Sequence, residues 1–432
     1  MKFGGSSLND INGFRQMVEI LKKENSEPIV MVVSAFSTAT RKLKEAALKA
    51  EASYYNESCQ IIDSIIAEHY QYCEMLLESK VNQISLKELL DSSSDRIKQF
   101  LKGISITEDL TPRTLDLLMS FGELFALRTI RGFLAEQGFD VVDIDSTKLI
   151  CSDNLHGKAK PLIDESENKI NNELLPLLKN KRIVLTQGFV ALSQKGEITT
   201  MGMESSNLTA AILASVLKSK QLTFWTNVSG VRDIDPDFGF PTINIPRINY
   251  DLAYRISRSG LKLIYPGTID IARNSNIELI YRNCFEPDSE STIINNGDMT
   301  IKEPIIIVEN DILLCQIPIK NSHDEIASKQ YLNKIILSEH LDPTIFKQSD
   351  SLILLFYGSN RRSAFFPEKL QYFSSDGLSL VTVLTNKLQI ERDLNINDKN
   401  NIYFNRSECQ NIIDNKILIK SDNLMEILRK LK

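Results

Sequence analysis

Short runs of apolar, largely β-branched residues recur along the first two thirds of the chain, and polar or turn-forming residues bound each run. This pattern predicts buried strands at Pro28–Ser34, Phe139–Ile144, Ile183–Gly188, Leu222–Val228 and Ile277–Tyr281. Between them, apolar residues repeat every three or four positions, which predicts helices over residues 14–21, Leu118–Leu134 and Leu208–Leu217. Strands that alternate with helices predict an α/β fold, with a mostly parallel sheet and helices on both faces.

Two regions depart from this alternation. Residues from about Glu51 to Leu110 are polar and helix-prone without a clear strand, which predicts a helical insertion in the α/β core. After about Gly297 the chain predicts a separate α+β domain of roughly 130 residues without a cluster of potential catalytic groups, which favours regulation or dimerisation. Its expected strands and closing helix are Pro304–Val308, Ile312–Ile317, Leu352–Tyr357, Leu378–Val383, Lys416–Lys420 and Asp422–Leu431.

Composition narrows the classes of function. Apolar residues make up 42% and charged residues 25% of the 432 residues, as in ordinary globular proteins. The chain has 50 Lys and Arg against 56 Asp and Glu, a net charge of −6, which gives no basis for binding nucleic acid or an anionic membrane. We find no run of about 18 apolar residues that would span a membrane and no signal-peptide core, so we expect a cytoplasmic protein.

Cysteine and histidine give little sign of a metal site. The six cysteines are scattered without a CxxC pair, which indicates reduced thiols. The four histidines lie apart from one another and from the cysteines. We therefore expect neither a disulfide framework nor a dedicated zinc site.

The first candidate for chemistry is Lys2–Ser7, which reads KFGGSS and leads directly into a helix. Two glycines let the backbone turn tightly and approach a ligand closely. Free N–H groups at a helix start, beside a lysine, form an anion site suited to phosphate. Taken alone, such a segment is more often a turn with a helix cap.

Four further segments carry small, polar or charged residues where a strand ends or a helix begins. They are Val32–Ala35 with Thr40, Thr199–Asn207, Trp225–Asp237 and Ser259–Pro266. The carboxyl ends of strands line ligand crevices in open α/β sheets. Taken one by one, however, ST-turns, helix caps, an Asp-Pro turn and a solvated lysine explain these segments without a function.

The order and spacing of all five segments resemble the aspartate kinases of the amino acid kinase family. The family pattern is K-F-G-G-T-S, V-x-S-A…T, G-E, Q-G-F, T-T-L-G-R-G-G-S-D, T-D-V-x-G-x-Y-x-x-D-P and G-A-K-V-x-H-P. This chain has KFGGSS, VVSAFSTAT, Gly122-Glu123, Gln187-Gly188-Phe189, TTMGMESSN, TNVSGVRDIDP and GLKLIYP. The match runs from residue 2 to about residue 295.

The resemblance implies transfer of the ATP γ-phosphoryl group, with Mg²⁺, to the β-carboxylate of L-aspartate, the first step of the lysine, threonine and methionine pathway. It implies a three-layer α/β/α catalytic domain over residues 1–297, with the helical insertion at about 51–110. It also implies an ACT-like regulatory region over residues 298–432 and a homodimer. The glycine-rich effector loop of ACT modules is absent after the strand at Ile312, so inhibition by lysine or threonine does not follow.

The resemblance also assigns roles to particular residues. The catalytic lysines are Lys2 and Lys262. The nucleotide-binding residues are Gly4, Gly5, Ser6, Thr226, Asn227, Arg232 and Asp237. The substrate-binding residues are Thr40, Glu123, Met203, Ser206 and Asn207, and no metal ligand is assigned. Two lysines and glycine loops suit phosphoryl transfer, because that reaction needs mostly positioning and positive charge.

Four positions differ from the family pattern: Met203 replaces an arginine, Asn207 and Asn227 replace aspartates, and Arg232 replaces a tyrosine. In the family the arginine and aspartate of the first loop help to hold the charged groups of the amino acid. Loss of an arginine–carboxylate contact costs roughly 1.5–3 kcal/mol, or about 10–150-fold in binding. Arg232 could supply positive charge in place of the arginine that is missing at Met203.

The substitutions leave three interpretations open. The chain is a divergent aspartate kinase, an impaired homologue with a regulatory or structural role, or a kinase for another carboxylate. Because one residue precedes Lys2, we also expect a shortened first strand.

Overall fold

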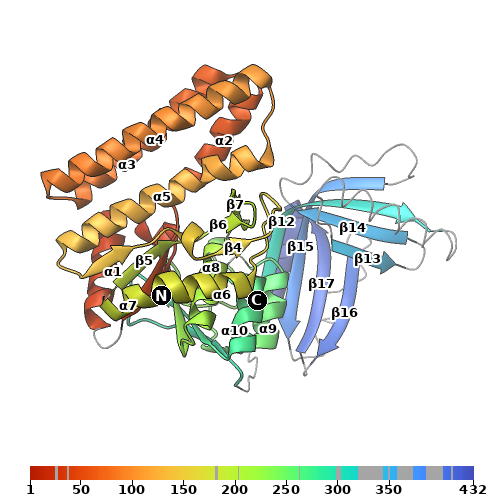
Figure 1. Ribbon diagram of the computed structural model, residues 1–432. Coiled ribbons are helices and arrows are strands. Elements are labelled where there is room, and N and C mark those ends of the chain that lie inside the picture. Colours follow the sequence, from red (N-terminus) through yellow and green to blue (C-terminus); the bar gives the residue numbers. More distant parts are fainter. Residues whose placement is uncertain are drawn as a thin grey trace. The chain divides into compact units, whose positions relative to one another are not determined.

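A computed structural model (Figure 1) describes residues 1–24, 28–36, 38–180, 183–202, 204–261, 263–297, 303–319, 344–348, 351–357, 373–385, 402–409 and 412–432. The chain forms two compact units. The first unit comprises Met1–Val231, Asn244–Tyr254 and Lys262–Asp298, and the second comprises Arg232–Ile243, Arg255–Leu261 and Met299–Lys432.

The first unit is built on an eight-stranded sheet with the strand order β3-β5-β2-β1-β8-β10-β11-β9. All strand pairs in it are parallel except β10 with β11. The strands are β1 (Lys2–Phe3), β2 (Ile29–Val33), β3 (Val141–Asp143), β5 (Ile183–Gln187), β8 (Gln221–Thr226), β9 (Arg247–Asn249), β10 (Glu278–Asn283) and β11 (Thr292–Asn295). A smaller sheet contains β4 (Cys151–Ser152), β6 (Val190–Ser193) and β7 (Ile198–Thr200).

Strand β1 has only two residues but lies in the middle of the large sheet. Lys2 pairs with Val32 of β2 on one side and with Phe224 of β8 on the other. From β1 the chain order therefore runs outward in both directions, through β2 in one and through β8 in the other. Ligands bind outside the carboxyl ends of parallel strands at such a reversal point.

Helices pack on both faces of this sheet, which confirms the predicted α/β class. They are α1 (Ile11–Lys23), α2 (Ala39–Glu51), α3 (Tyr55–Leu76), α4 (Lys80–Thr107), α5 (Pro112–Glu136), α6 (Ile163–Lys169), α7 (Leu175–Asn180), α8 (Ser206–Val216), α9 (Tyr250–Arg258) and α10 (Pro266–Ser275). The largest apolar core joins α1 and α5 to the sheet, and the rings of Phe14 and Phe133 meet edge to face at 5.6 Å. Helix α8 packs on β1, β2 and β8.

The region predicted as a helical insertion contains α3 and α4, which form a long antiparallel pair next to α2 and α5 (Figure 1). Buried apolar residues recur on their inner faces, including Ile62, Ile66, Leu90 and Leu101. This packing joins the pair to the same apolar core as α1 and α5. Within the described residues, no helix is both long enough and apolar enough to cross a membrane.

The second unit contains a six-stranded antiparallel sheet with the order β13-β14-β12-β15-β17-β16. Its strands are β12 (Ile305–Pro318), β13 (Thr344–Gln348), β14 (Ser351–Tyr357), β15 (Phe373–Thr385), β16 (Ile402–Cys409) and β17 (Ile412–Lys420). Helix α13 (Leu424–Leu431) packs its apolar side on this sheet through Leu424, Ile427 and Leu428. The mixture of strands with a covering helix is the predicted α+β arrangement.

One strand of the second unit differs from the prediction. The runs at Pro304–Val308 and Ile312–Ile317 were expected to be two strands, but they form the single strand β12. The polar residues between them are accommodated by a register shift between Glu309 and Ile312, where Asp311 adopts φ +61°. A β-bulge of this kind absorbs an extra residue without ending the strand.

The segment Arg232–Ile243 belongs to the second unit although it precedes the last strands of the first. Ile234 is buried in the apolar core of that unit, and Phe238 and Phe240 pack against it. The buried carboxylate of Asp233 pairs with Lys432. That residues 1–297 form a catalytic domain and residues 298–432 a regulatory region stays a prediction.

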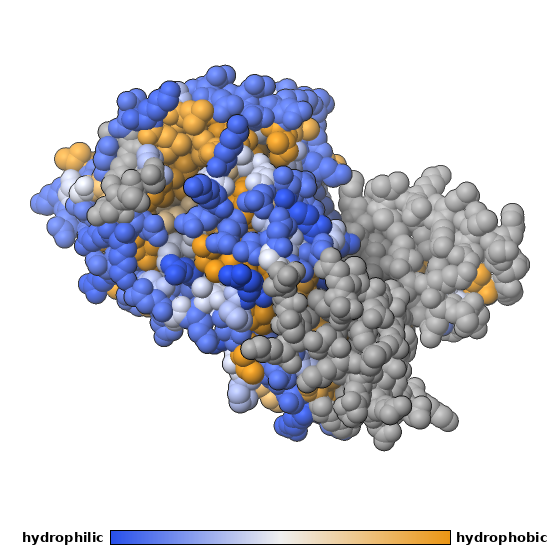
Figure 2. Space-filling view, turned by 90° about the horizontal axis from the view of Figure 1, so that it is seen from below, coloured by the Kyte–Doolittle hydropathy of each residue, from blue (hydrophilic) through white to orange (hydrophobic). Residues whose placement is uncertain are grey.

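Among the coloured residues of the face in Figure 2, hydrophilic side chains predominate, and apolar side chains gather in one area in its upper part. Large exposed apolar side chains occur on several elements, among them Leu48, Val81, Ile84, Ile106 and Leu155. Scattered exposure of this sort is normal for folded proteins.

Candidate active site

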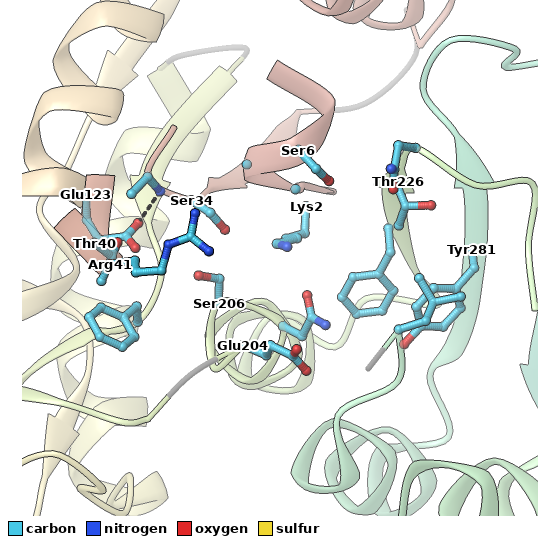
Figure 3. A pocket seen from close by; sticks show the side chains of 18 residues that line it. Lys2, Ser6, Ser34, Thr40, Arg41, Glu123, Glu204, Ser206, Thr226 and Tyr281 are labelled. Carbon is cyan, nitrogen blue, oxygen red and sulfur yellow. Dashed lines mark hydrogen bonds between the residues drawn. The ribbon is translucent and has the colours of Figure 1, made fainter. Parts of the chain in front are cut away.

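A pocket of about 570 Å³ lies at the carboxyl ends of the central strands of the first unit (Figure 3). Its size is within the usual range for small-molecule sites. Residues that follow β1, β2, β5 and β8 line it, together with the starts of α2 and α8. The lining residues are Lys2, Gly4, Gly5, Ser6, Ser34, Ala35, Thr40, Arg41, Glu123, Phe189, Glu204, Ser206, Asn207, Phe224, Thr226, Asn227, Leu263 and Tyr281.

The glycine loop after β1 forms one wall. The amide of Gly4 donates to the carbonyl of Trp225 at 3.0 Å, and the amide of Ser7 donates to the carbonyl of Gly4 at 3.0 Å. A Cβ on Gly4 would lie 3.7 Å from Nζ of Lys2, so the lysine ammonium is close to this loop. A short 3₁₀ turn follows at Gly5–Leu8. A positive charge beside a small-residue loop suits a phosphate group.

Lys2 is held in a partly desolvated position. Burial lowers the pKa of its ammonium to about 8, while Glu123 and Glu204 act in the opposite direction. Desolvation disfavours the charged form, so an incoming anion would find a cation with few competing water contacts. Such a cation interacts more strongly with a phosphoryl group than an exposed lysine does.

Glu123 of α5 lies in the opposite wall and is only 3% exposed. Its Oε2 accepts a hydrogen bond from the amide of Ala35 at 2.7 Å, which ties α5 to the end of β2 (Figure 3). Burial raises the pKa of this carboxyl to about 8, against the opposing effects of the Ala35 amide and Lys2. The carboxyl is thus ready to ionise when a cation binds beside it.

The loop from β7 to α8 forms the floor. It passes very close to the end of β5, because a Cβ on Gly188 would lie 2.5 Å from Cα of Ser206. Asn207 is 8% exposed and lines the pocket. Glu204 adopts φ +66°, a conformation that glycine usually occupies.

We expect Gly188→Ala to raise the KM for a substrate bound in this pocket at least about tenfold, because the start of α8 must move away from the new methyl group. Overpacking of this kind typically costs 1–3 kcal/mol, so Tm should fall as well. Steady-state kinetics and thermal melts measure both effects. Gly103→Ala is the matched control, since a Cβ there meets nothing within 4 Å. Unchanged kinetics in Gly188→Ala would contradict the close approach.

A buried carboxylate supports the strand that leads into this floor. Asp116 is fully buried, and it accepts hydrogen bonds from the hydroxyl of Thr200 and, at 3.0 Å, from the amide of Gly157. Nδ1 of His156 lies 2.8 Å from the same carboxylate, and its Nε2 lies 3.3 Å from Glu197. This network fastens the 153–160 loop to β7 and thereby orients the segment before Ser206.

The structure brings ten of the predicted site residues into this one pocket: Lys2, Gly4, Gly5, Ser6, Thr40, Glu123, Ser206, Asn207, Thr226 and Asn227. Arg232 and Asp237 belong to the second unit and are not among its lining residues. Met203 and Lys262 lie outside the described residues. The individual role of every one of these residues stays a prediction.

Eight lining residues were not among the predicted site residues: Ser34, Ala35, Arg41, Phe189, Glu204, Phe224, Leu263 and Tyr281. The rings of Phe224 and Tyr281 stack at 4.7 Å. The hydroxyl of Tyr281 is buried without a hydrogen-bond partner among the described residues, and burial raises its pKa. In the sequence, Phe224 and Tyr281 look like ordinary strand core, whereas Arg41 directly follows a predicted substrate residue and could have been singled out by that position.

The described residues contain no group of three or more His, Cys, Asp or Glu arranged to hold a metal ion. The pocket does contain the two carboxylates of Glu123 and Glu204. Mg²⁺ is usually bound through one or two carboxylates, water and substrate phosphates. One carboxylate together with phosphate oxygens and water is therefore a donor set that fits a magnesium ion arriving with a nucleotide.

Comparisons with known proteins agree with this geometry. The sequence model of the amino acid kinase family matches residues 1–283. Lysine-sensitive aspartokinase 3 of Escherichia coli is 28% identical over 295 residues, which is 68% of this chain and 63% of that protein. Bifunctional aspartokinase/homoserine dehydrogenase 2 of Arabidopsis thaliana is 26% identical over 310 residues, 70% of this chain and 33% of that protein. The chain thus spans between a third and two thirds of the length of these curated relatives.

A solved structure shows the same fold. Aspartokinase III of E. coli, in complex with aspartate and ADP, superposes with a TM-score of 0.84 at 21% sequence identity, covering 100% of this chain and 98% of that one. The family match extends over well more than half of the chain and includes every strand end that lines the pocket. The chain therefore belongs to the amino acid kinase family, and the relatives that it resembles are aspartokinases.

Proposed function

We propose that this chain is an aspartate kinase that transfers the γ-phosphoryl group of ATP to the β-carboxylate of L-aspartate, giving 4-phospho-L-aspartate. One observation carries the proposal: a lysine and a glycine loop form one wall of a pocket whose other walls present Glu123, Thr40 and Ser206. This arrangement supports a phosphate site and an amino acid site in one cavity. The aspartokinase relatives support the same assignment.

On the nucleotide side, Lys2 neutralises negative charge on the phosphoryl group while it is being transferred. Gly4, Gly5 and Ser6 contact the phosphates through their backbone. Thr226 and Asn227 lie at the end of β8, where the nucleotide would extend. When bound with ATP, Mg²⁺ offsets phosphate charge. Lys262 is the second predicted cation at the phosphates.

On the acceptor side, Glu123 pairs with the ammonium group of the amino acid, and Thr40, Ser206 and Asn207 offer polar contacts. The reaction needs the β-carboxylate to approach the γ-phosphorus in line with the leaving oxygen. Both groups are held in one pocket, so the protein contributes positioning as well as charge.

The decisive experiment is a coupled ADP-release assay with ATP, Mg²⁺ and L-aspartate, combined with hydroxylamine trapping of the acyl phosphate. Aspartate-dependent ADP release together with a hydroxamate product is expected. Release of ADP without hydroxamate would point to simple ATP hydrolysis. No ADP release with any amino acid would contradict the proposal.

The neutral side chain of Asn207 in the acceptor wall favours a second hypothesis, an impaired homologue with a regulatory or structural role, or a kinase for another carboxylate. Calorimetric binding measurements, together with the ADP-release assay, distinguish both alternatives from an active aspartate kinase. An impaired homologue should bind ATP or ADP without turnover. A kinase for another carboxylate should release ADP with an acceptor other than aspartate. An active aspartate kinase would stand at the first step of the lysine, threonine and methionine pathway.

We further propose that the second unit is an ACT-like regulatory region through which the chain forms a homodimer. Its described part has an antiparallel sheet and a covering helix but contributes no residue to the pocket. Light scattering at micromolar concentration should give the mass of a dimer for the full chain and of a monomer for a chain ending at Gly297. Circular dichroism checks that the shortened chain is folded, because its truncation uncovers Ile234. A monomeric full chain would contradict the proposal.

A further inference from the structure

Arg41 is a cation that the resemblance to known kinases does not assign. It lies in the first turn of α2, directly after Thr40, and its side chain points into the pocket (Figure 3). Within the described part of the chain it makes no hydrogen bond or ion pair, whereas the neighbouring carboxylate of Glu123 already accepts a bond from Ala35. Its guanidinium is therefore available to a ligand.

The two basic residues among the described lining residues occupy different walls. Lys2 comes from β1 and stays close to the glycine loop. Arg41 comes from α2, from the same wall as Thr40 and Glu123. Since a phosphoryl group at the glycine loop would engage Lys2, Arg41 remains for a second anionic group on the acceptor side.

An amino acid acceptor supplies such a group. It carries an ammonium group, the carboxylate that receives the phosphoryl group, and a second carboxylate that does not react. With the ammonium at Glu123 and the reacting carboxylate towards Lys2, the unreactive carboxylate is left towards α2. A guanidinium holds a carboxylate through two parallel N–H···O bonds, which fixes its orientation as well as its charge.

The start of α2 adds donors at the same place. Thr38, the residue that precedes the helix, makes no side-chain capping hydrogen bond to it. The first turn of a helix leaves N–H groups without intrahelical partners, and its partial positive charge favours a carboxylate. Guanidinium and helix start thus act on an anion together.

We propose that Arg41 is the specificity-determining residue that binds the unreactive α-carboxylate of the acceptor, in place of the loop arginine that the chain lacks at Met203. This inference rests on the proposed function. It explains how a pocket without the loop arginine can select a dicarboxylic amino acid. It also predicts that recognition depends on charge at the α-carboxylate and not only on its size.

The test compares two ligands in the full chain with ADP present: L-aspartate, and L-isoasparagine, in which a neutral amide replaces the α-carboxylate. By calorimetry, the unchanged protein should bind L-aspartate at least about tenfold more tightly than L-isoasparagine. Arg41→Gln should weaken L-aspartate binding about 10–100-fold and leave L-isoasparagine binding nearly unchanged. The affinity of Arg41→Lys for L-aspartate should lie between that of the unchanged protein and that of Arg41→Gln. Lys44→Gln, which removes the same charge from an exposed position on α2, should match the unchanged protein.

Each other outcome overturns the inference. If Arg41→Gln weakens ADP or ATP binding and not L-aspartate binding, Arg41 serves the nucleotide. If it weakens both amino acids equally, its role is structural. If the unchanged protein does not distinguish the two amino acids, or binds neither at millimolar concentration, no residue recognises the α-carboxylate.

Measuring turnover of aspartate distinguishes a failure of this inference from a failure of the proposed function. Charge-dependent binding through Arg41 without ADP release from aspartate would refute the aspartate kinase and retain the α-carboxylate site. Turnover of aspartate that Arg41→Gln does not alter would refute the inference and retain the kinase.

Discussion

Lys2→Met should lower kcat about a hundredfold to a thousandfold while the protein stays folded. The charge of Lys2 acts where negative charge is transferred, and loss of one such preorganised group typically costs this much. Because burial lowers the pKa of the ammonium to about 8, the charged form that predominates at neutral pH is less stable in the folded protein than in water. An isosteric apolar side chain removes that cost, so Tm should not fall.

The pH dependence supplies an independent check on this variant. The pKa of Lys2 in the folded protein, about 8, lies below the ordinary lysine value of 10.5. Above pH 10.5 Lys2 is neutral in both the folded and the unfolded protein, so its burial costs no charge penalty. As the pH falls from 10.5 through 8, Lys2 becomes charged and the folded protein loses stability. The Tm advantage of Lys2→Met should therefore be largest below pH 8 and shrink at higher pH. Lys44→Met is the matched control, and a Lys2→Met protein with unchanged kcat would refute the catalytic role.

Glu123→Gln should increase the stability of the protein and at the same time weaken its binding of L-aspartate. The glutamine carbonyl can still accept the hydrogen bond from the amide of Ala35, but it carries no charge in a buried site. Without that charge the ammonium group of the substrate loses its partner, so the KM for L-aspartate should rise about 10–100-fold. The stabilisation should exceed about 1 kcal/mol at pH 8, since one pKa unit corresponds to about 1.4 kcal/mol.

The sign of the pH effect follows from the direction of the shift. Burial raises the pKa of Glu123 from 4.5 to about 8. The stability associated with its protonated form is complete below pH 4.5 and is lost as the pH rises through 8. Thermal melts should therefore show a Tm difference between Glu123→Gln and the unchanged protein that grows from pH 4.5 to 8. The exposed Glu45→Gln should show no such trend, and a pH-independent difference would mean that Glu123 is already ionised in the empty pocket.

These two predictions describe one physical feature. The pocket keeps a lysine and a glutamate whose charged forms are both disfavoured by burial. Buried charges of this kind reduce stability and are retained at sites that bind or react. A bound anion at Lys2 and a bound cation at Glu123 would restore the charged forms, so L-aspartate affinity should increase as the pH approaches 8.

The sequence by itself determined the alternation of strands and helices and the order of the loops. Strand and helix follow from local periodicity, and parallel strands place their carboxyl ends at one edge. Lys2 and Thr226 could therefore be expected near one another although they are far apart in the chain, whereas Glu123, on a helix, was assigned to the site only by the family resemblance. The helical character of residues 51–110 was visible for the same reason, because apolar spacing is a local property.

Tertiary structure alone decided the features that depend on distant contacts. The polar break in β12 became a bulge because neighbouring strands hold both halves of it in one sheet. The sequence places Arg41 next to the predicted site residue Thr40, but only the placement of α2 decided that the Arg41 side chain enters the pocket. Gly188 proved restrictive only through its approach to Ser206. The raised pKa of Glu123 and the lowered pKa of Lys2 also arise from burial. Burial is set by the packing of the whole unit, which no local pattern encodes.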